Sequence, residues 1–264
     1  FLKAGLLDRA EDALKKLDGT PFENQARLAL LAIYERSREW PQAAEIATRL
    51  EASGEASFSG RLAHYLCEQA GALQTSGDPA SATVLLEKAI HDAPDAARPR
   101  LQLAALQRSQ GRDTDALSTL KALTESAPEA TPLAAAGLAD VALACDQVPA
   151  VLALLRARYE QDPALDTMEA IVRLEAETDG DGRDGYIRHL QHEPSLIAAA
   201  RWIAGEKLEH DQFHPLVQRA LDHAVKPLSR YRCAACGFEA KDHFWQCPGC
   251  QAWDSYPPRR VEEL

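Results

Sequence analysis

A period of 34 residues runs through the middle of the chain and constrains the fold more than any other feature of the sequence. Two segments carry the same order of small residues, leucines and a closing proline, with every landmark displaced by the same 34 positions. The first copy consists of Gly77, Ala82, Leu86, Ala89 and Pro94, and the second of Gly111, Ala116, Leu120, Leu123 and Pro128. Repeats of this length bury their apolar faces by stacking on their neighbours. The chain is therefore predicted to build its core from stacked repeats.

Each landmark has a physical role if the repeat is a helix–turn–helix unit. The glycine ends the first helix and opens the turn, and the proline stops the second helix before the next repeat begins. Alanines allow close helix packing, and Ala70 and Ala104 place small residues where the first helices meet the second ones. This spacing is typical of the tetratricopeptide repeat. We therefore predict an all-α tetratricopeptide-repeat (TPR) solenoid.

A third copy is predicted 34 positions further on, at Cys145, Ala150, Leu154 and Ala157. Leu138 takes the place of the small residue on its first helix. We therefore expect this copy to follow the repeat pattern more loosely than the other two.

Earlier in the chain the repeats are less regular. Residues 5–21 and 39–50 each have the pattern of a second helix, and residues 52–60 are interpreted as an insertion before the next repeat. Aligning Gly5 with the glycines of the later copies places Phe1 midway through a first helix. We therefore expect the first repeat to be truncated and more protein to lie upstream.

Beyond residue 165 the landmarks fade, although apolar residues keep helical spacing in segments 165–177, 194–209 and 214–225. The polar, glycine-rich stretch TDGDGRDG, residues 178–185, is interpreted as a linker. Terminal repeats need an atypical capping face. We therefore predict three parts, which are TPR repeats in 1–164, degenerate helical repeats that form a cap in 165–228, and a separate module in 229–264.

Four cysteines near the end of the chain predict the chemistry of this module. They follow the pattern Cys-x2-Cys-x10-Cys-x2-Cys and are Cys233, Cys236, Cys247 and Cys250. Each CxxC can fold as a knuckle that directs two sulfurs to one point, with Gly237 and Gly249 supplying the backbone freedom for the turns. Two knuckles give tetrahedral S4 coordination, which suits structural Zn²⁺ or rubredoxin-type iron. The module is too small for a hydrophobic core of its own, so we predict a rubredoxin-like or zinc-ribbon fold held by one metal ion.

Two disulfides are the alternative interpretation of these cysteines. The spacing favours a metal, and four thiolates favour a structural role because they leave no open coordination position for water or substrate. Redox activity would need iron. A rubredoxin that transfers electrons on a TPR scaffold is therefore an alternative function, which metal identity and a reversible change in visible absorbance would distinguish.

No catalytic constellation emerges from the rest of the sequence. His210 and His214 have the spacing of a zinc-binding HExxH helix, but Asp replaces Glu and no further ligand follows. The loop around Arg183 imitates a calcium-binding EF-hand, but this arginine takes the place of the fifth ligand. Cys67 and Cys145 are predicted to be buried apolar residues. We therefore expect a protein without enzymatic activity.

The bulk properties exclude further classes. A net charge of −11 argues against a nucleic-acid-binding surface as the main function of the chain. No apolar run approaches the roughly 18 residues that would span a bilayer, and no secretory signal is visible. We therefore expect this chain to be soluble and to belong to a reducing compartment.

The combination of TPR repeats with this cysteine module resembles the lipopolysaccharide assembly protein B family of Gram-negative bacteria. The resemblance covers nearly the whole chain and is most specific in the segments Lys226–Pro227, Tyr231–Phe238 and Trp245–Trp253. In that family an N-terminal transmembrane helix, which this chain does not include, anchors a cytoplasmic TPR domain that ends in a rubredoxin-like module. The resemblance implies that the anchored protein lies at the cytoplasmic face of the inner membrane and that the four cysteines hold the metal.

The resemblance also implies a function. Members of the family regulate lipopolysaccharide synthesis as adaptors. They help a membrane-anchored, FtsH-type ATP-dependent protease to degrade the UDP-3-O-acyl-N-acetylglucosamine deacetylase that commits material to lipid A. The implied partners are this protease, the deacetylase and, as a further option, other lipopolysaccharide assembly proteins.

The cysteine module has a second resemblance, to the N-terminal knuckle of bacterial RecA-like DNA-repair ATPases. Those proteins carry a P-loop ATPase domain after the ribbon, whereas here the ribbon ends the chain. Residues 225–264 hold six Lys and Arg against five Asp and Glu, a net charge of +1 with little attraction for phosphates. Nucleic-acid binding is therefore the weaker hypothesis.

Overall fold

The structure of the chain is a computed structural model that describes residues 7–54, 57–179, 182–206 and 211–264. Phe1 and Gly5, on which the expected truncated first repeat depends, lie outside the described residues. The chain divides into two units, Phe1–Leu106 and Gln107–Leu264, and each is described by itself. None of the helices in the described ranges is long and apolar enough to cross a membrane.

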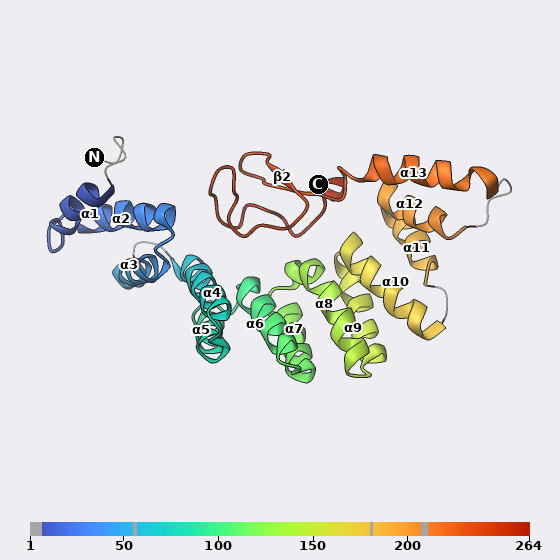
Figure 1. Cartoon of the computed structure of the whole chain (residues 1–264), viewed down its shortest axis with the longest axis horizontal. Coiled ribbons are helices and arrows are strands. Elements are labelled where there is room, and N and C mark those ends of the chain that lie inside the picture. Colours follow the sequence, from blue (N-terminus) through green and yellow to red (C-terminus); the bar gives the residue numbers. More distant parts are fainter. Residues whose placement is uncertain (1–6, 55–56, 180–181, 207–210) are drawn as a thin grey trace. The chain divides into compact units, whose positions relative to one another are not determined.

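In the first unit, helices α1 to α5 each pack against the next along the chain (Figure 1). Its core between α4 and α6 buries Cys67 and Ala70 together with the landmark residues Ala82 and Leu86, as predicted. The helices are α1 (Leu7–Lys15), α2 (Glu23–Ser37), α3 (Trp40–Ser53), α4 (Ser59–Thr75), α5 (Pro79–Asp92) and α6 (Ala97–Ser109), the last of which crosses the boundary between the units.

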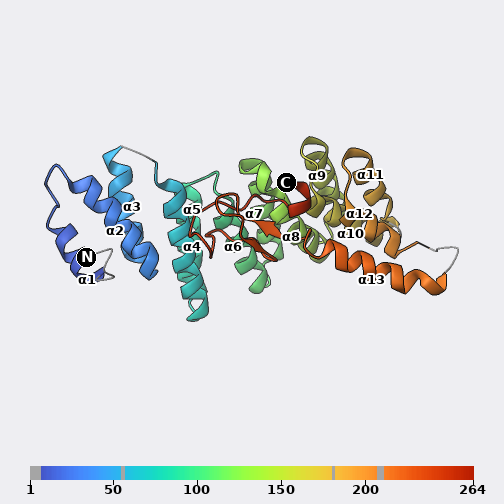
Figure 2. The same cartoon turned by 90° about the horizontal axis from the view of Figure 1, so that it is seen from above.

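The second unit continues the helix pairs and ends in the cysteine module, which lies beside α8 and α10 (Figure 1, Figure 2). The predicted fold class, an all-α TPR solenoid with a small C-terminal metal module, is confirmed. The elements are α7 (Asp113–Ser126), the 3₁₀ helix η2 (Pro128–Ala130), α8 (Thr131–Ala144), α9 (Val148–Gln161), α10 (Leu165–Asp179), α11 (Asp184–His192), α12 (Leu196–Ala204), η3 (Asp211–Phe213), α13 (His214–Val225), β1 (Tyr231–Arg232), β2 (Glu239–Ala240) and η4 (Val261–Glu263).

The turns of the first two copies behave as the glycine landmarks predict. Gly77 and Gly111 have φ of 86° and 70°, the left-handed conformation that glycine adopts without strain. The next residue then donates its backbone N–H to a carbonyl five positions back, at 2.9 Å in both turns. These bonds satisfy carbonyls at the helix end that would otherwise lack a partner.

The third copy corrects the predicted alignment by one residue. The left-handed position is Asp146 (φ 53°), 35 rather than 34 positions after Gly111, and Cys145 is not left-handed. Accordingly Val151 and Leu155 are fully buried on α9. The predicted landmarks do not fill the core, because Ala150 and Ala157 are exposed and Leu154 is half-buried.

The extra residue enters before α8, at the 3₁₀ turn η2. Downstream of it Ala139, not Leu138, takes the position of Ala104, so the small residue is retained one place later. Both Leu138 and Ala139 are completely buried. The prediction that Leu138 occupies the position of the small residue is therefore wrong. Pro128 still follows the 34-residue period, which hides the shift from the sequence.

The predicted linker 178–185 also needs correction. Helix α10 continues to Asp179 and α11 begins at Asp184, so both ends of this stretch are helical. A Cβ at Gly185 would lie 2.6 Å from Val172 Cγ2 and 2.9 Å from Met168 Sδ, both on α10. Gly185 therefore allows close packing of α11 on α10 rather than flexibility. Residues 180–181 lie outside the described part.

Candidate metal centre

The first knuckle is held by a short hairpin and two local hydrogen bonds. Strands β1 and β2 pair antiparallel, which brings the chain back over the first two cysteines. The Cys233 N–H donates to the Phe238 carbonyl at 2.9 Å, and the Gly237 N–H donates to the Cys233 carbonyl at 2.8 Å. Gly237 has φ of 78°, so its predicted role in the turn is confirmed.

The second knuckle repeats this pattern with different residues. The Cys247 N–H donates to the Ala252 carbonyl and the Gln251 N–H to the Cys247 carbonyl, both at 2.8 Å. The left-handed residue is Gln251 (φ 62°), so the prediction that Gly249 supplies this conformation is wrong. A Cβ at Gly249 would instead lie 3.4 Å from the Phe238 ring, which packs over the second knuckle.

The two knuckles bring the four predicted sulfurs together. All four Sγ atoms lie within 4.8 Å of one another. The Sγ atoms of Cys233 and Cys250 are 3.8 Å apart, and those of Cys236 and Cys247 are 3.7 Å apart. A tetrahedron with metal–sulfur bonds of about 2.3 Å has edges of about 3.8 Å. These separations therefore fit a metal centre with four cysteine ligands, and all four cysteines are free thiols rather than the disulfides considered as the alternative.

Opposing influences act on the ionisation of the thiols. Burial opposes the Cys233 thiolate, but the Ser255 hydroxyl and backbone N–H groups of the same knuckle outweigh it and lower its pKa to about 6. The pKa of Cys247 is also lowered, because backbone N–H groups outweigh burial. The Phe238 N–H favours the Cys236 thiolate, yet partial desolvation and the neighbouring sulfurs raise its pKa to about 12. A bound divalent cation would stabilise the thiolate form of all four cysteines.

One side of the centre is buried and the other faces outward. Cys233 and Cys247 are each 1 % exposed and pack with Tyr231 and Tyr256 against Leu133 of α8. Cys236 and Cys250 are exposed. The centre therefore joins the module to the helices on one side and leaves two sulfurs accessible on the other.

Residues 259–263, next to the C-terminal residue, fasten the module to the helices, and we call them the C-terminal clasp. Glu262 accepts the N–H groups of Leu196 and Ile197 at the start of α12, at 2.5 and 3.2 Å. Glu263 accepts the N–H of Leu165 at the start of α10, at 2.8 Å. Carboxylates at helix N-termini accept hydrogen bonds from the free N–H groups, and their negative charge interacts favourably with the positive end of the helix dipole.

Arg260 completes the clasp. Its guanidinium forms two hydrogen bonds with the Asp166 carboxylate on α10, at 2.8 and 2.9 Å, and a third with the Ser229 carbonyl at 2.8 Å. It also stacks 4.2 Å from the centre of the Tyr231 ring, whose hydroxyl donates to Asp166 at 3.3 Å. Sequence reasoning missed the clasp. The available signal was Ala164, which precedes α10 and has no side-chain acceptor to cap it.

The other weighed motifs do not form sites in the described residues. His210 lies outside them, and the Nε2 of His214 contacts the carbonyl of Ile203 at 3.2 Å at the start of α13. Cys67 is fully buried, and burial raises its pKa to about 12, in agreement with an apolar role. Cys145 is half-buried rather than buried as predicted.

Comparison with known proteins connects this centre to a family. Residues 231–257 match the family model described as rubredoxin metal binding domain, and residues 73–141 match tetratricopeptide repeat. The chain is similar to lipopolysaccharide assembly protein B. It is 26 % identical over 268 residues to that protein of Escherichia coli (strain K12), which covers 98 % of this chain and 69 % of the relative. It is 28 % identical over 288 residues to that of Haemophilus influenzae (strain Rd), covering 100 % of this chain and 68 % of the relative.

The resemblance to the lipopolysaccharide assembly protein B family that the sequence predicts is therefore confirmed. Among solved structures, the C-terminal part of a TPR repeat-containing protein from Cytophaga hutchinsonii aligns with a TM-score of 0.49 and 13 % identity. The alignment covers 85 % of this chain and 92 % of that structure.

Proposed function

We propose that this chain is a non-enzymatic adaptor that regulates lipopolysaccharide synthesis at the cytoplasmic face of the bacterial inner membrane. In this proposal it promotes degradation of the UDP-3-O-acyl-N-acetylglucosamine deacetylase by a membrane-anchored, FtsH-type ATP-dependent protease. The observation that carries the proposal is the similarity to lipopolysaccharide assembly protein B over 98 % of the chain, including both the repeats and the metal module.

The architecture supports the role of an adaptor. TPR solenoids present extended surfaces to protein partners. The clasp ties the metal module to the starts of α10 and α12, so a partner held by the module would have a defined orientation relative to these helices. In this proposal residues 1–164 bind partners, 165–228 close the repeats, and 229–264 form the metal module.

The metal belongs to this proposal as a structural group. Cys233, Cys236, Cys247 and Cys250 would hold one ion, Zn²⁺ or iron, and its chemistry would be to neutralise four thiolates and fold the module. Elemental analysis of the purified protein identifies the ion. Electron transfer would require iron and a reversible change in visible absorbance.

Exchange of metal ligands tests the adaptor function. In cells whose own gene carries C233S and C236S, the deacetylase should persist for as long as in cells that lack the protein, because the module unfolds without its metal. The half-life of the deacetylase, followed by immunoblot after synthesis is blocked, is the measurement. The matched control is C145S, which removes a thiol outside the centre and should leave the half-life normal. Normal turnover in the double variant would contradict the proposal.

Capture of partners from membrane extracts complements this test. The wild-type protein should recover the protease and the deacetylase together, and the C233S/C236S variant should lose at least one of them. Recovery of nucleic acid instead of these proteins would favour the rival hypothesis.

A further inference from the structure

The metal module, helices α10 and α12, and the segment that follows α13 line a basic cleft. The cavity has a volume of about 410 Å³. We call it the junction cleft and define it by its charged lining, which consists of Arg201, Lys226, Arg230, Lys241 and Arg260 with Asp166 and Glu169. Five cations against two carboxylates make a local excess of positive charge on a chain whose net charge is −11.

Two of these cations have no partner among the described residues. Arg260 is bound to Asp166 in the clasp, and Arg201 lies 3.4 Å from Glu169. Lys226, at the end of α13, and Lys241, directly after β2, form no ion pair within the described part of the chain and are exposed. They approach the same cleft from the helices and from the metal module, respectively.

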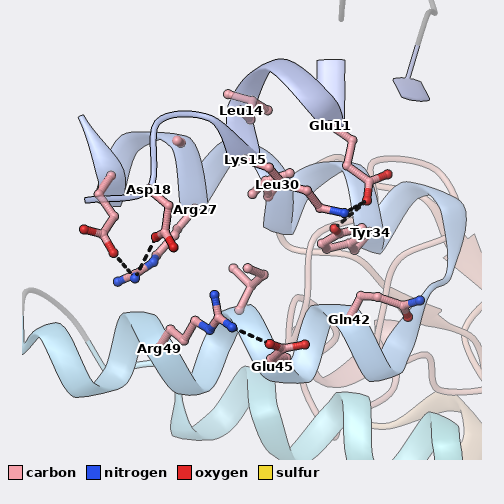
Figure 3. A pocket seen from close by; sticks show the side chains of 13 residues that line it. Glu11, Leu14, Lys15, Asp18, Arg27, Leu30, Tyr34, Gln42, Glu45 and Arg49 are labelled. Carbon is pink, nitrogen blue, oxygen red and sulfur yellow. Dashed lines mark hydrogen bonds and ion pairs between the residues drawn. The ribbon is translucent and has the colours of Figure 1, made fainter. Parts of the chain in front are cut away.

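A cavity in the first unit shows a lining whose cations all have partners within the chain. It has a volume of about 380 Å³ and lies among α1, α2 and α3 (Figure 3). Its three cations are all paired. Lys15 lies 2.6 Å from Glu11, Arg49 lies 2.6 Å from Glu45, and Arg27 binds Asp18 and Glu23. The junction cleft differs because its lysines are left for an external anion.

The carboxylates of the cleft indicate what kind of anion fits. Glu169 is half-buried, and its contact with Arg201 is long. Burial raises the pKa of Glu169, and its side-chain donor, Arg201, only partly offsets this effect. A phosphate group could bind the lysines but offers few donors to Glu169. A peptide offers backbone N–H groups to Glu169 and its own carboxylates to the lysines.

A neighbouring cavity adds an apolar requirement. It has a volume of about 450 Å³ and shares Asp166, Glu169, Arg201 and Arg260 with the junction cleft. Its far wall is formed by small and apolar residues of α8 and α10, which include Leu133, Ala136 and Ala170. A ligand that spans both cavities would place an apolar group next to its acidic groups.

We propose that the junction cleft binds a short acidic peptide segment of a partner protein, with an apolar side chain beside its acidic residues. This inference deepens the proposed adaptor function and rests on it for the identity of the partner. The peptide chemistry itself depends only on the lining of the two cavities.

Fluorescence anisotropy with labelled peptides tests the cleft on the full, metal-loaded chain. The probe is a ten-residue peptide in which Glu and Asp flank Leu, and its two controls replace the acids by Gln and Asn or the Leu by Ser. The acidic probe should bind most tightly, and its binding should weaken as salt is raised from about 50 to about 200 mM. Equal binding of the acidic and amide peptides, or no binding, would overturn the proposal.

Charge reversal locates the binding site. K226E/K241E should weaken binding of the acidic probe at least about tenfold, because two attractions become repulsions. The matched control K16E/K88E makes the same change in net charge on exposed lysines elsewhere and should change binding less than about twofold. If both double variants lost binding of the acidic probe equally, the effect would be one of general charge, and the proposal that the junction cleft is the binding site would be overturned.

Vesicles of phosphatidylglycerol test the competing source of anions. If these vesicles bound in a Lys226- and Lys241-dependent way while the peptides did not, the cleft would be a lipid headgroup site and the proposal would be wrong. The two proposals fail separately. Loss of peptide binding overturns the cleft alone, whereas a normal deacetylase half-life in the C233S/C236S variant overturns the adaptor alone.

Discussion

Single residues with left-handed backbone define the two knuckles of the metal centre. Gly237 (φ 78°) and Gln251 (φ 62°) occupy equivalent positions, each four residues after the first cysteine of its knuckle. A residue with a Cβ is strained in this conformation by about 1–2 kcal/mol, whereas glycine is not. A Cβ on Gly237 would meet no atom within 4 Å, so only backbone strain distinguishes the two positions.

Adding a Cβ at position 237 and removing one at position 251 should therefore have opposite effects on the stability of the module. G237A should destabilise the metal-bound module by about 1 kcal/mol, and Q251G should stabilise it by a similar amount. Because metal binding and folding of such a module are coupled, competition with a chromophoric chelator measures both. The apparent metal affinity should change about fivefold, downward for G237A and upward for Q251G. A change in the same direction for both variants would contradict the equivalence of the two positions.

At the scale of elements, the N-termini of α10 and α12 are capped by carboxylates from the C-terminal clasp. Glu263 caps α10, and its side chain is only 4 % exposed. Burial, the largest influence, raises the pKa of Glu263 above its ordinary value of 4.5, although the N–H groups of Leu165 and Arg260 favour the ionised form. The folded state therefore binds this proton at a pH where the unfolded state has lost it. Its contribution to stability is fully present below pH 4.5 and is lost as the pH rises through the folded pKa.

Substitution of Glu263 should reveal this pH dependence. E263Q keeps an acceptor for the Leu165 N–H but cannot titrate, so the wild type should gain stability relative to E263Q as the pH falls from about 7.5 to about 5.5. E263A loses the cap and should be less stable than the wild type by about 1 kcal/mol at pH 7.5 and by more at pH 5.5, because it cannot titrate either. Urea unfolding of the three proteins gives the differences. A wild type that loses stability relative to E263Q on acidification would contradict the raised pKa.

The same elements show how far the sequence could predict the molecule. Local spacing sufficed for the four cysteines and for the first two repeats, because knuckles and helix turns depend on residues a few positions apart. The shift at Asp146 was hidden because the extra residue lies in η2, after a proline that keeps the period. Helix α11 was missed because its glycine-rich start has the composition of a loop, and Gly185 is explained only by contact with α10. The clasp depends on contacts between residues more than 60 positions apart, which spacing does not reveal.

At the scale of the whole molecule, stability should be distributed along the repeats and anchored at one end by the metal. Each repeat mainly contacts its neighbours, so a local loss propagates only as far as the interfaces it breaks. The metal module is joined to α10 and α12 through the clasp and to α8 through Leu133. Folding of the module is in turn coupled to the metal. Metal removal should therefore affect a defined set of elements.

Hydrogen exchange after chelation should map that set. Amides of residues 231–264 should lose protection almost completely, and the first turns of α10 and α12 should exchange about 5- to 30-fold faster, because each loses caps worth about 1–2 kcal/mol. Helices α4 and α5 pack on each other, α4 also packs on α3, and both should keep their protection. The C233S/C236S variant should reproduce this pattern without a chelator, which separates loss of metal from side effects of the reagent. Unchanged exchange at Leu165 and Leu196 would mean that the clasp holds without the metal, and uniform loss across α4 and α5 would mean that the repeats unfold as one unit.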